Sequence, residues 1–285
     1  MMVFMSAWAY TVCDVFTDAP LAGNPLAVFT DAADIPDAAL GRLAREMNLS
    51  ETVFVYPPQH GADARLRIFT PAKELPFAGH PVLGTAAVLG LARHLNEVRL
   101  QTGVGVVPVT LQPKGARHAF GWMRQPVPTY TPFGDVAPLL QALGTMRSTL
   151  PVEVYNNGVQ HAYVALEDEE AVARLTPNLG AIARLVPEIG VNCFAGRGRR
   201  WKTRMFGPGL GVPEDPATGS AAGPLAVHLL RYSLIAPGEQ IEISQGAEIG
   251  RPSLLHARVN GAPHEIHQVE VGGAMVLVAR GEVLL

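Results

Sequence analysis

The stretch VPEDPATGSAAG, residues 212–223, places two carboxylates, Glu214 and Asp215, before a tight turn. Gly219 and Ser220 then lead into a run of small and apolar residues that is typical of a helix. Aspartate at such a turn is a common cap, because its side chain accepts hydrogen bonds from free backbone N–H groups. A carboxylate beside a buried helix start can also hold or move a proton. The stretch is therefore compatible with an acidic helix cap and with half of an active site.

Glu51 is a second acidic candidate. It lies in NLSETVFV, residues 48–55, at the start of an apolar strand-like run. Apolar surroundings disfavour the charged form of a carboxylate and raise its pKa toward the range that is useful for moving protons at neutral pH. A solvent-facing edge residue or a local cap is the alternative. His80, in the sequence AGHP, is equally compatible with a structural and a functional role.

The segments that end at His80 and Ser220 resemble each other. Residues 67–80, RIFTPAKELPFAGH, and 204–220, RMFGPGLGVPEDPATGS, both run from Arg through an apolar residue, Phe and Pro into a loop rich in Gly and Pro. Each ends in a small residue, a glycine and then the polar residue, directly before an apolar helix. The two loops lie nearly half of the 285-residue chain apart. This pattern predicts an internal duplication with two similar domains.

The domain boundary is expected in the Pro-rich stretch RQPVPTYTPFGD, residues 124–135. We assign residues 1–127 to the first domain and residues 128–273 to the second. The C-terminal strand, residues 274–285, is expected to join the first domain.

Strand signals dominate the chain, and three helices are predicted. The helix at 37–47 starts at an aspartate suited to N-capping and has one apolar face, formed by Leu40, Leu43, Ala44 and Met47. The helices at about 81–94 and 220–232 are almost uncharged. Since a helix that is apolar all round must be buried on all sides, we expect each of these two to be wrapped by its own sheet. The predicted strands are YTVCDVFT, NPLAVF, ETVFVY, ARLRIFT, VRLQTGVGVVPVTLQ, VEVYNN, HAYVAL, WKTRMF, QIEISQ, LLHARV and AMVLVA.

Gly79 and Gly219 open the two apolar helices. A helix start exposes unpaired N–H groups and the positive end of the helix dipole, and glycine allows close approach of the backbone. If both turns face one cleft, they would bind an anionic group, most simply a carboxylate. Neither loop has the lysine of a phosphate-binding P-loop.

Composition narrows the classes of function. The net charge is −3, hydrophobic residues make up 48% of the chain, and no block of like charges occurs, so nucleic acid is not an expected partner. The apolar start has neither a basic segment before it nor the length of a membrane span, which predicts a cytoplasmic protein without a membrane partner. The two cysteines, Cys13 and Cys193, lie in apolar strand-like runs and are expected to be buried thiols, a disulfide being the minor alternative.

Five segments in order resemble the phenazine-biosynthesis isomerase family, the PhzF-like proteins. They are DVFTDAPLAGNPLAVF, NLSETVFV, RIFTPAKELPFAGHPVLGTA, GVPEDPATGSA and QGAEIGRPS, and the resemblance extends from about residue 8 to the end of the chain. It implies an α+β, diaminopimelate-epimerase-like fold of two similar domains, each a β-barrel wrapped around a central apolar helix. It also implies a homodimer, no metal, no organic cofactor and an active site between the domains.

The resemblance implies catalytic roles for Glu51, His80 and Asp215, and substrate binding by Gly79, Gly219 and Ser220. The implied function is a cofactor-independent isomerase that moves a proton between carbons of a small, unsaturated, carboxylate-bearing substrate. The family's named member acts on trans-2,3-dihydro-3-hydroxyanthranilate.

Two alternatives remain open from the sequence. An amino-acid epimerase or racemase of the same fold would use two opposed cysteines at the heads of the central helices, where this chain has His80 and Ser220. A non-catalytic protein that binds a small molecule in the same cleft is the second alternative.

Overall fold

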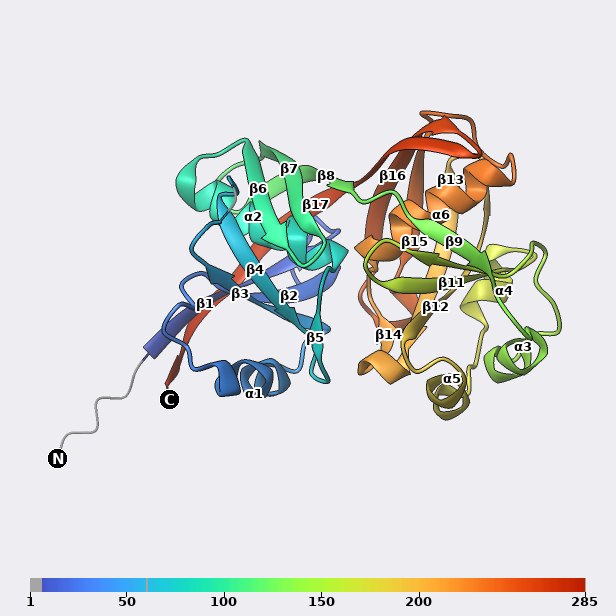
Figure 1. Ribbon diagram of the computed structural model, residues 1–285, viewed down its shortest axis with the longest axis horizontal. Coiled ribbons are helices and arrows are strands. Elements are labelled where there is room, and N and C mark those ends of the chain that lie inside the picture. The colour runs from blue at the N-terminus through green and yellow to red at the C-terminus, as the bar shows by residue number, and fades with distance from the viewer. Residues whose placement is uncertain (1–6, 60, 285) are drawn as a thin grey trace.

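The structure is a computed structural model that describes residues 7–59 and 61–284. The chain forms two lobes that lie side by side (Figure 1). Within these residues, 17 strands are hydrogen-bonded into one continuous sheet that passes through both lobes. Each lobe curls its part of the sheet around one apolar helix.

The first lobe is a closed barrel of eight strands. The ring runs β1–β2–β3–β4–β6–β7–β8–β17 and returns to β1. The bounds are β1 (Ala7–Val15), β2 (Asn24–Phe29), β3 (Glu51–Tyr56), β4 (Ala64–Phe69), β6 (Glu97–Thr102), β7 (Gly105–Pro113), β8 (His118–Gln125) and β17 (Glu265–Leu284). Helix α2 (Gly79–Arg93) fills the barrel and is buried from Gly79 through Gly90, as its all-round apolar sequence predicts.

The second lobe wraps in the same way around α6 (Gly219–Arg231), which is buried from Gly219 through Leu230. Its strands follow the order β9, β10, β11, β12, β13, β15, β16 and the first part of β17. The bounds are β9 (Thr129–Pro132), β10 (Glu153–Asn156), β11 (Gln160–Ala165), β12 (Ile189–Arg197), β13 (Arg200–Gly207), β15 (Gln240–Gln245) and β16 (Ser253–Ala262).

Strand pairing repeats between the lobes. The parallel pair β2–β3 corresponds to β11–β12, and the parallel pair β4–β6 corresponds to β13–β15. Two short antiparallel strands, β5 (Glu74–Leu75) and β14 (Val212–Asp215), occupy matching places beside β4 and β13. The matched motifs even carry matching ion pairs, Arg67 with Glu74 and Arg204 with Glu214. The predicted duplication into two similar domains is confirmed.

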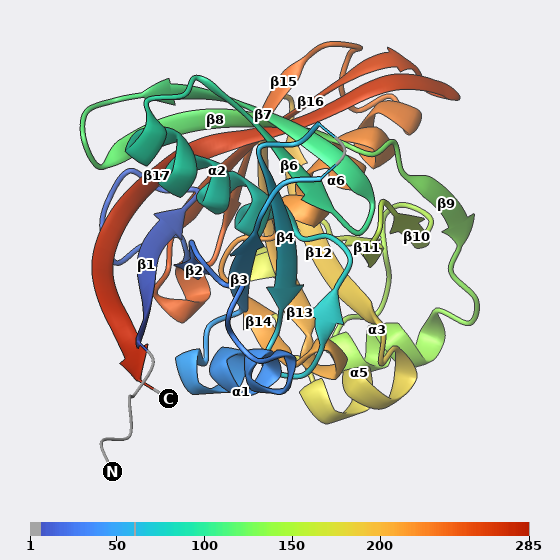
Figure 2. The same ribbon diagram turned by 60° about the vertical axis from the view of Figure 1, so that its left-hand side comes forward.

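Strand β17 joins the two barrels and is much longer than the six-residue strand predicted from AMVLVA. Its first part, Glu265–Gly272, pairs with β16, and its last part, Met275–Leu284, pairs with β1 (Figure 2). Val269–Val276 also pair with β8. We propose the domain division 1–127 with 274–285, and 128–273, because this strand leaves one barrel and enters the other near residue 273.

Helix α1 (Asp37–Met47) has the predicted bounds, but its start differs from the expectation. The residue before it is Pro36 and Asp37 makes no capping bond; its carboxylate instead pairs with Arg67. The second lobe also carries short helices that the sequence interpretation missed: α3 (Ala137–Leu143), α4 (Glu169–Ala173), α5 (Leu179–Leu185) and the 3₁₀ turns η1 (Pro208–Leu210) and η2 (Ala247–Ile249). None of the helices in the described part of the chain has the length and apolar character that a membrane crossing requires.

Candidate active site

The two central helices meet head to head at their first glycines. A Cβ atom added to Gly79 would lie only 2.4 Å from the carbonyl carbon of Gly219, so the backbones approach as closely as glycine allows. In the described residues neither helix start has a side-chain cap. Both starts open into one cavity between the lobes, which is lined by residues of both.

All six residues singled out in the sequence line this cavity. They are Glu51, Gly79, His80, Asp215, Gly219 and Ser220. Glu51 comes from the start of β3, Asp215 from the end of β14, and the other four from the first turns of α2 and α6. The site is thus assembled from both lobes, and its acidic and basic groups are buried.

Glu51 faces His80 across the cavity wall. Its Oε2 atom lies 3.4 Å from His80 Nε2, and neither atom has a well-aligned hydrogen bond to any other described residue. The two side chains are 12% and 3% exposed. A buried carboxylate oxygen that points into a cavity without a partner is costly unless a ligand or water satisfies it. This pair of atoms is therefore available to a bound molecule.

Asn24 sets the protonation of His80. Its side-chain amide nitrogen lies 2.8 Å from Asp215 Oδ1, 2.9 Å from the Ala217 carbonyl oxygen and 3.2 Å from His80 Nδ1. Since a carbonyl can only accept, the NH₂ group faces this side, and its two hydrogens are used by the nearer acceptors, Asp215 and Ala217. A proton on Nδ1 would point at this NH₂ group, which favours the tautomer without it. Burial lowers the pKa of His80 to about 3, so the ring is neutral at ordinary pH and its proton lies on Nε2, toward Glu51.

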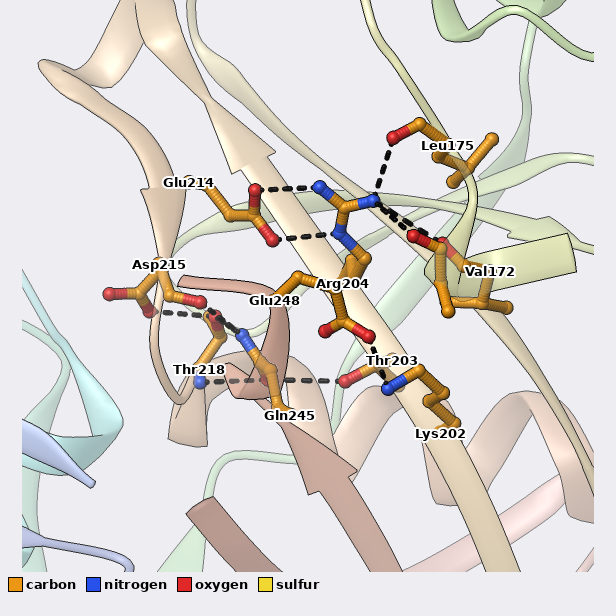
Figure 3. A network of polar contacts seen from close by, with 11 residues as sticks. Val172, Leu175, Lys202, Thr203, Arg204, Glu214, Asp215, Thr218, Gln245 and Glu248 are labelled. Carbon is orange, nitrogen blue, oxygen red and sulfur yellow. Dashed lines mark hydrogen bonds and ion pairs between the residues drawn. The ribbon is translucent and has the colours of Figure 1, made fainter. Parts of the chain in front are cut away.

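Asp215 is held by three side-chain donors. Its Oδ1 accepts from Asn24 and from Ser50 Oγ, at 2.8 Å each, and its Oδ2 accepts from Thr218 Oγ1 at 2.7 Å. Gln245 supports the loop by donating to the Asp215 carbonyl oxygen at 2.8 Å and to Thr218 Oγ1 at 2.9 Å (Figure 3). Burial raises the pKa of Asp215 to about 6, while these hydrogen bonds act in the opposite direction.

The pKa of Glu51 is raised well above its ordinary value, first by burial and then by the negative charge of Asp215. Asp215 has three donors that stabilise its anion, whereas Glu51 has none of comparable quality. The proton shared by these two acids therefore resides preferentially on Glu51. Such a carboxyl can act both as an acid and, once ionised, as a base of increased strength.

Ser220 contacts a residue that the sequence interpretation missed. Its Oγ lies 3.0 Å from His161 Nε2, and His161 Nδ1 lies 3.3 Å from the Asn192 side-chain nitrogen. Asn157 donates to the Ser220 carbonyl oxygen at 2.9 Å. This donor is needed because Pro224, four residues later, has no N–H for the usual helix bond.

The internal repeat does not identify these partners. Asn24 lies in the GNP sequence of a quoted segment, but we assigned no role to it. Ile68 and Met205 are matched positions of the repeat, and they pair with Val53 and Asn192. Two residues earlier, Glu51 matches Gly190, so His161 is the counterpart of Leu26 rather than of Asn24.

The cysteines lie elsewhere. Cys13 and Cys193 are fully buried free thiols whose pKa values are raised by burial, and neither contributes to the cavity lining. The prediction of buried thiols is confirmed, and the disulfide alternative was wrong. In the described residues no three His, Cys, Asp or Glu side chains are grouped as metal ligands would be.

Comparison with known proteins gives a consistent result. The sequence pattern of the PhzC-PhzF family, described as phenazine biosynthesis-like protein, matches residues 13–281. The chain is 50% identical over 276 residues to trans-2,3-dihydro-3-hydroxyanthranilate isomerase of Pseudomonas aeruginosa, covering 97% of this chain and 99% of that protein. The enzyme of the same name from Pseudomonas fluorescens is 49% identical over the same length and coverage.

Solved structures agree with the fold. A PhzF-family phenazine biosynthesis protein of Bacillus anthracis superposes with a TM-score of 0.85 at 24% identity, covering 99% of this chain and all of that one. A hydroxyproline epimerase of Agrobacterium vitis has a TM-score of 0.66 at 13% identity, covering 99% of this chain and 92% of that one, which shows a shared fold alone. The chain belongs to the PhzC-PhzF, phenazine biosynthesis-like family, and it is an isomerase.

Proposed function

We propose that this isomerase moves a proton between two carbons of an unsaturated, carboxylate-bearing ring, without a cofactor, and that Glu51 carries the proton. The observation that carries the proposal is the Glu51 carboxyl itself. It is buried, its pKa is raised, and one oxygen faces the cavity without a well-aligned partner among the described residues. In its ionised form Glu51 takes a proton from one carbon, and in its neutral form it returns the proton at another.

The other residues divide the remaining work. His80, neutral and protonated on Nε2, holds Glu51 in position and donates to the carboxylate form. The N–H groups at the starts of α2 and α6 bind the substrate carboxylate and stabilise the charge that spreads onto it when carbon loses its proton. Asp215 accepts from a hydroxyl or amino group of the substrate. Glu51, His80 and Asp215 are thus proposed as catalytic, with Gly79, Gly219 and Ser220 as substrate-binding.

We further propose trans-2,3-dihydro-3-hydroxyanthranilate as the substrate. Identities of 49–50% over nearly the whole length of enzymes with that name support this choice. The compound also fits the chemistry of the cavity. It presents a carboxylate for the helix starts, a hydroxyl and an amine for the polar wall, and a ring proton for Glu51.

Deuterium incorporation tests the proposal. The protein is incubated in D₂O with trans-2,3-dihydro-3-hydroxyanthranilate, and the product is examined by mass spectrometry and absorbance. We expect isomerisation with carbon-bound deuterium, and a loss of about 10²–10⁴-fold in rate for Glu51→Gln. The control is Glu46→Gln, on the exposed face of α1, which should retain the wild-type rate. Normal turnover by Glu51→Gln would remove Glu51 from the mechanism.

The racemase alternative lacks its chemical groups. Two-base stereoinversion of that kind needs a thiol at the head of each central helix. Those places hold His80 and Ser220, and both cysteines of the chain are buried away from the cavity. Racemisation of free amino acids that is abolished by thiol alkylation would revive this alternative.

Two expectations from the family resemblance also stay proposals. We propose a homodimer, to be checked by light scattering coupled to size-exclusion chromatography, with a single 30.3 kDa species as the contradicting result. We propose a cytoplasmic location, which cell fractionation would check, and which the two unpaired buried thiols favour because a reducing compartment keeps thiols free.

A further inference from the structure

His161 is a buried, charge-free group that the proposed mechanism does not use. It comes from β11, is 1% exposed and lines the cavity. Gly190 lies opposite it on β12, and a Cβ atom added there would be only 2.9 Å from His161 Nδ1. The glycine therefore leaves room for the imidazole ring to lie flat against the neighbouring strand.

The hydrogen bonds around His161 have a fixed direction. The Asn192 side-chain nitrogen lies 3.4 Å from the Gly190 carbonyl oxygen and 3.3 Å from His161 Nδ1. Since the carbonyl can only accept, the NH₂ group of Asn192 faces both atoms, and Nδ1 is an acceptor. Burial lowers the pKa of His161 to about 3, so the ring is neutral and its single proton lies on Nε2.

The Nε2 proton points to Ser220 Oγ, 3.0 Å away. The serine oxygen therefore accepts from His161, and the serine's own proton is free to turn toward the cavity. There it adds a donor to the N–H groups of the two helix starts, which line the same cavity.

A similar set of contacts exists in the first lobe. The Asn24 side-chain nitrogen lies 3.2 Å from Nδ1 of His80, and Nε2 of His80 faces Glu51. The two sets are not matched residue for residue, since the strand register makes Val53 the counterpart of Asn192 and Gly190 the counterpart of Glu51. Both lobes nevertheless place an amide beside Nδ1 of a buried histidine and a polar side chain beside its Nε2.

We propose that His161 is a positioning residue that makes the Ser220 hydroxyl an obligatory donor to the substrate carboxylate. The proposal rests on the proposed function, because it concerns how the same cavity selects a carboxylate-bearing ligand. His161 itself exchanges no proton with the substrate. Removing it frees Ser220 Oγ to point elsewhere and weakens recognition of the carboxylate alone.

The tautomer of His161 provides a test that needs no ligand. Protein with ¹⁵N-labelled histidine side chains is observed by NMR, and the His161 signals are assigned by their loss in His161→Gln. We expect an acceptor-type Nδ1 and a protonated Nε2 that persist to pH 5. A proton on Nδ1, or an imidazolium near neutral pH, would overturn the proposal.

A matched pair of ligands tests the consequence for binding. 3-Hydroxyanthranilate is an aromatic analogue of the proposed substrate, and 2-aminophenol is the same molecule without the carboxylate. A hydrogen bond to a charged group contributes enough for His161→Leu to weaken 3-hydroxyanthranilate binding about 10-fold or more, with 2-aminophenol binding unchanged. His161→Gln, which keeps an N–H donor at this position, should restore most of the affinity.

A double-mutant cycle with Ser220→Ala separates positioning from a general structural defect. If His161 acts through Ser220, His161→Leu causes no further loss in the Ser220→Ala protein. Equal losses for both ligands, or losses that multiply in the double variant, would overturn the proposal. Failure of the wild-type protein to bind 3-hydroxyanthranilate would instead count against the proposed function, and the NMR result would then decide the role of His161.

Discussion

The wall of the cavity that holds Glu51 and the wall that holds Ser220 are built from the same parts. Each has an asparagine whose side-chain nitrogen lies beside Nδ1 of a buried, neutral histidine, and each histidine directs Nε2 toward a further polar side chain, its terminal group. On one wall the terminal group is a carboxyl, and on the other it is a hydroxyl. The Glu51 carboxyl can exchange a proton with a substrate carbon at neutral pH. The Ser220 hydroxyl can only donate a hydrogen bond to the substrate.

A second pair of matched positions strengthens this difference. Asp215 is opposite Met205 on β13, and its counterpart in the first lobe, Leu75, is opposite Ile68 on β4. Asp215 faces the Glu51 wall and raises the pKa of Glu51, whereas Leu75 places an apolar side chain in the cavity. The two lobes thus repeat these strands, whereas the two acidic residues of the cavity, Glu51 and Asp215, interact with each other.

The largest effect that would test this difference between the Glu51 wall and the Ser220 wall is expected for Asp215→Asn. Loss of the negative charge lowers the pKa of Glu51, since that charge is one of the two causes that raise it. We expect kcat/KM to fall by about 10²-fold or more and the acidic limb of its pH profile to move to lower pH. A pH–rate series on both proteins checks this. An unchanged limb would show that the two carboxyls do not interact.

Gly79→Ala tests whether both walls of the cavity depend on the close contact between Gly79 and Gly219. The added methyl would lie 2.4 Å from the backbone of Gly219, so we expect a loss of about 1–3 kcal/mol in the free energy of unfolding, together with a loss of activity. The matched control is Gly41→Ala in α1, where the added methyl would lie 3.8 Å from the end of the flexible Arg45 side chain. That change should stabilise the protein by about 0.5–1 kcal/mol. Urea denaturation of both variants checks the contrast.

Asn192→Asp should reverse the direction of the hydrogen bond between His161 and Ser220. A carboxylate at this position accepts from Nδ1, which moves the neutral ring's proton away from Nε2 and raises the pKa of His161. Ser220 must then donate to His161, and binding of 3-hydroxyanthranilate should weaken about 10-fold at alkaline pH and recover as His161 becomes protonated. Titration calorimetry across pH checks this. Asn192→Ala is the control, with a loss that does not vary with pH in this way.

A further effect concerns acid stability. The folded-state pKa of His161 is about 3, below the ordinary value of 6.5, so the unfolded chain binds the proton more readily between these pH values. Stability is therefore lost as the pH falls below 6.5, by at most about 1.4 kcal/mol per pH unit for this group. His161→Leu should show a shallower loss between pH 6.5 and 4. The raised pKa of Asp215 has the opposite effect on stability. Because Asp215 is present in both proteins, its contribution cancels when His161→Leu is compared with wild type. Parallel curves for the two proteins would contradict the burial of a neutral ring.

The repeat and the two apolar helices predicted the arrangement of the fold because both are local patterns. The 37–47 helix has its predicted bounds, and α2 and α6 begin within two residues of the predicted starts. Helices α3, α4 and α5 were missed because each has at most seven residues, too few for a clear apolar period. The extent of β17 was missed because Gly272 and Gly273, which interrupt its strand pattern, are where it passes between the barrels.

The site was predictable to the extent that its residues lie in sequence motifs. Glu51, His80 and Asp215 were found in this way, and the structure brings them to one cavity. Asn24 and His161 were not, because their importance comes from contacts across long sequence separations: Asn24 with Asp215, and His161 with Ser220. A strand histidine surrounded by apolar residues carries no local signal that distinguishes it from a core residue.

The contact between Gly79 and Gly219 has a consequence for how such a duplicated protein can diverge. Because the two backbones touch, an insertion or a larger side chain at either helix start displaces the other start as well. The halves can therefore acquire different chemistry only through residues that surround this point. New specificities are expected to arise by substitution of cavity-lining residues such as Leu75 or Val159, while Gly79 and Gly219 stay unchanged.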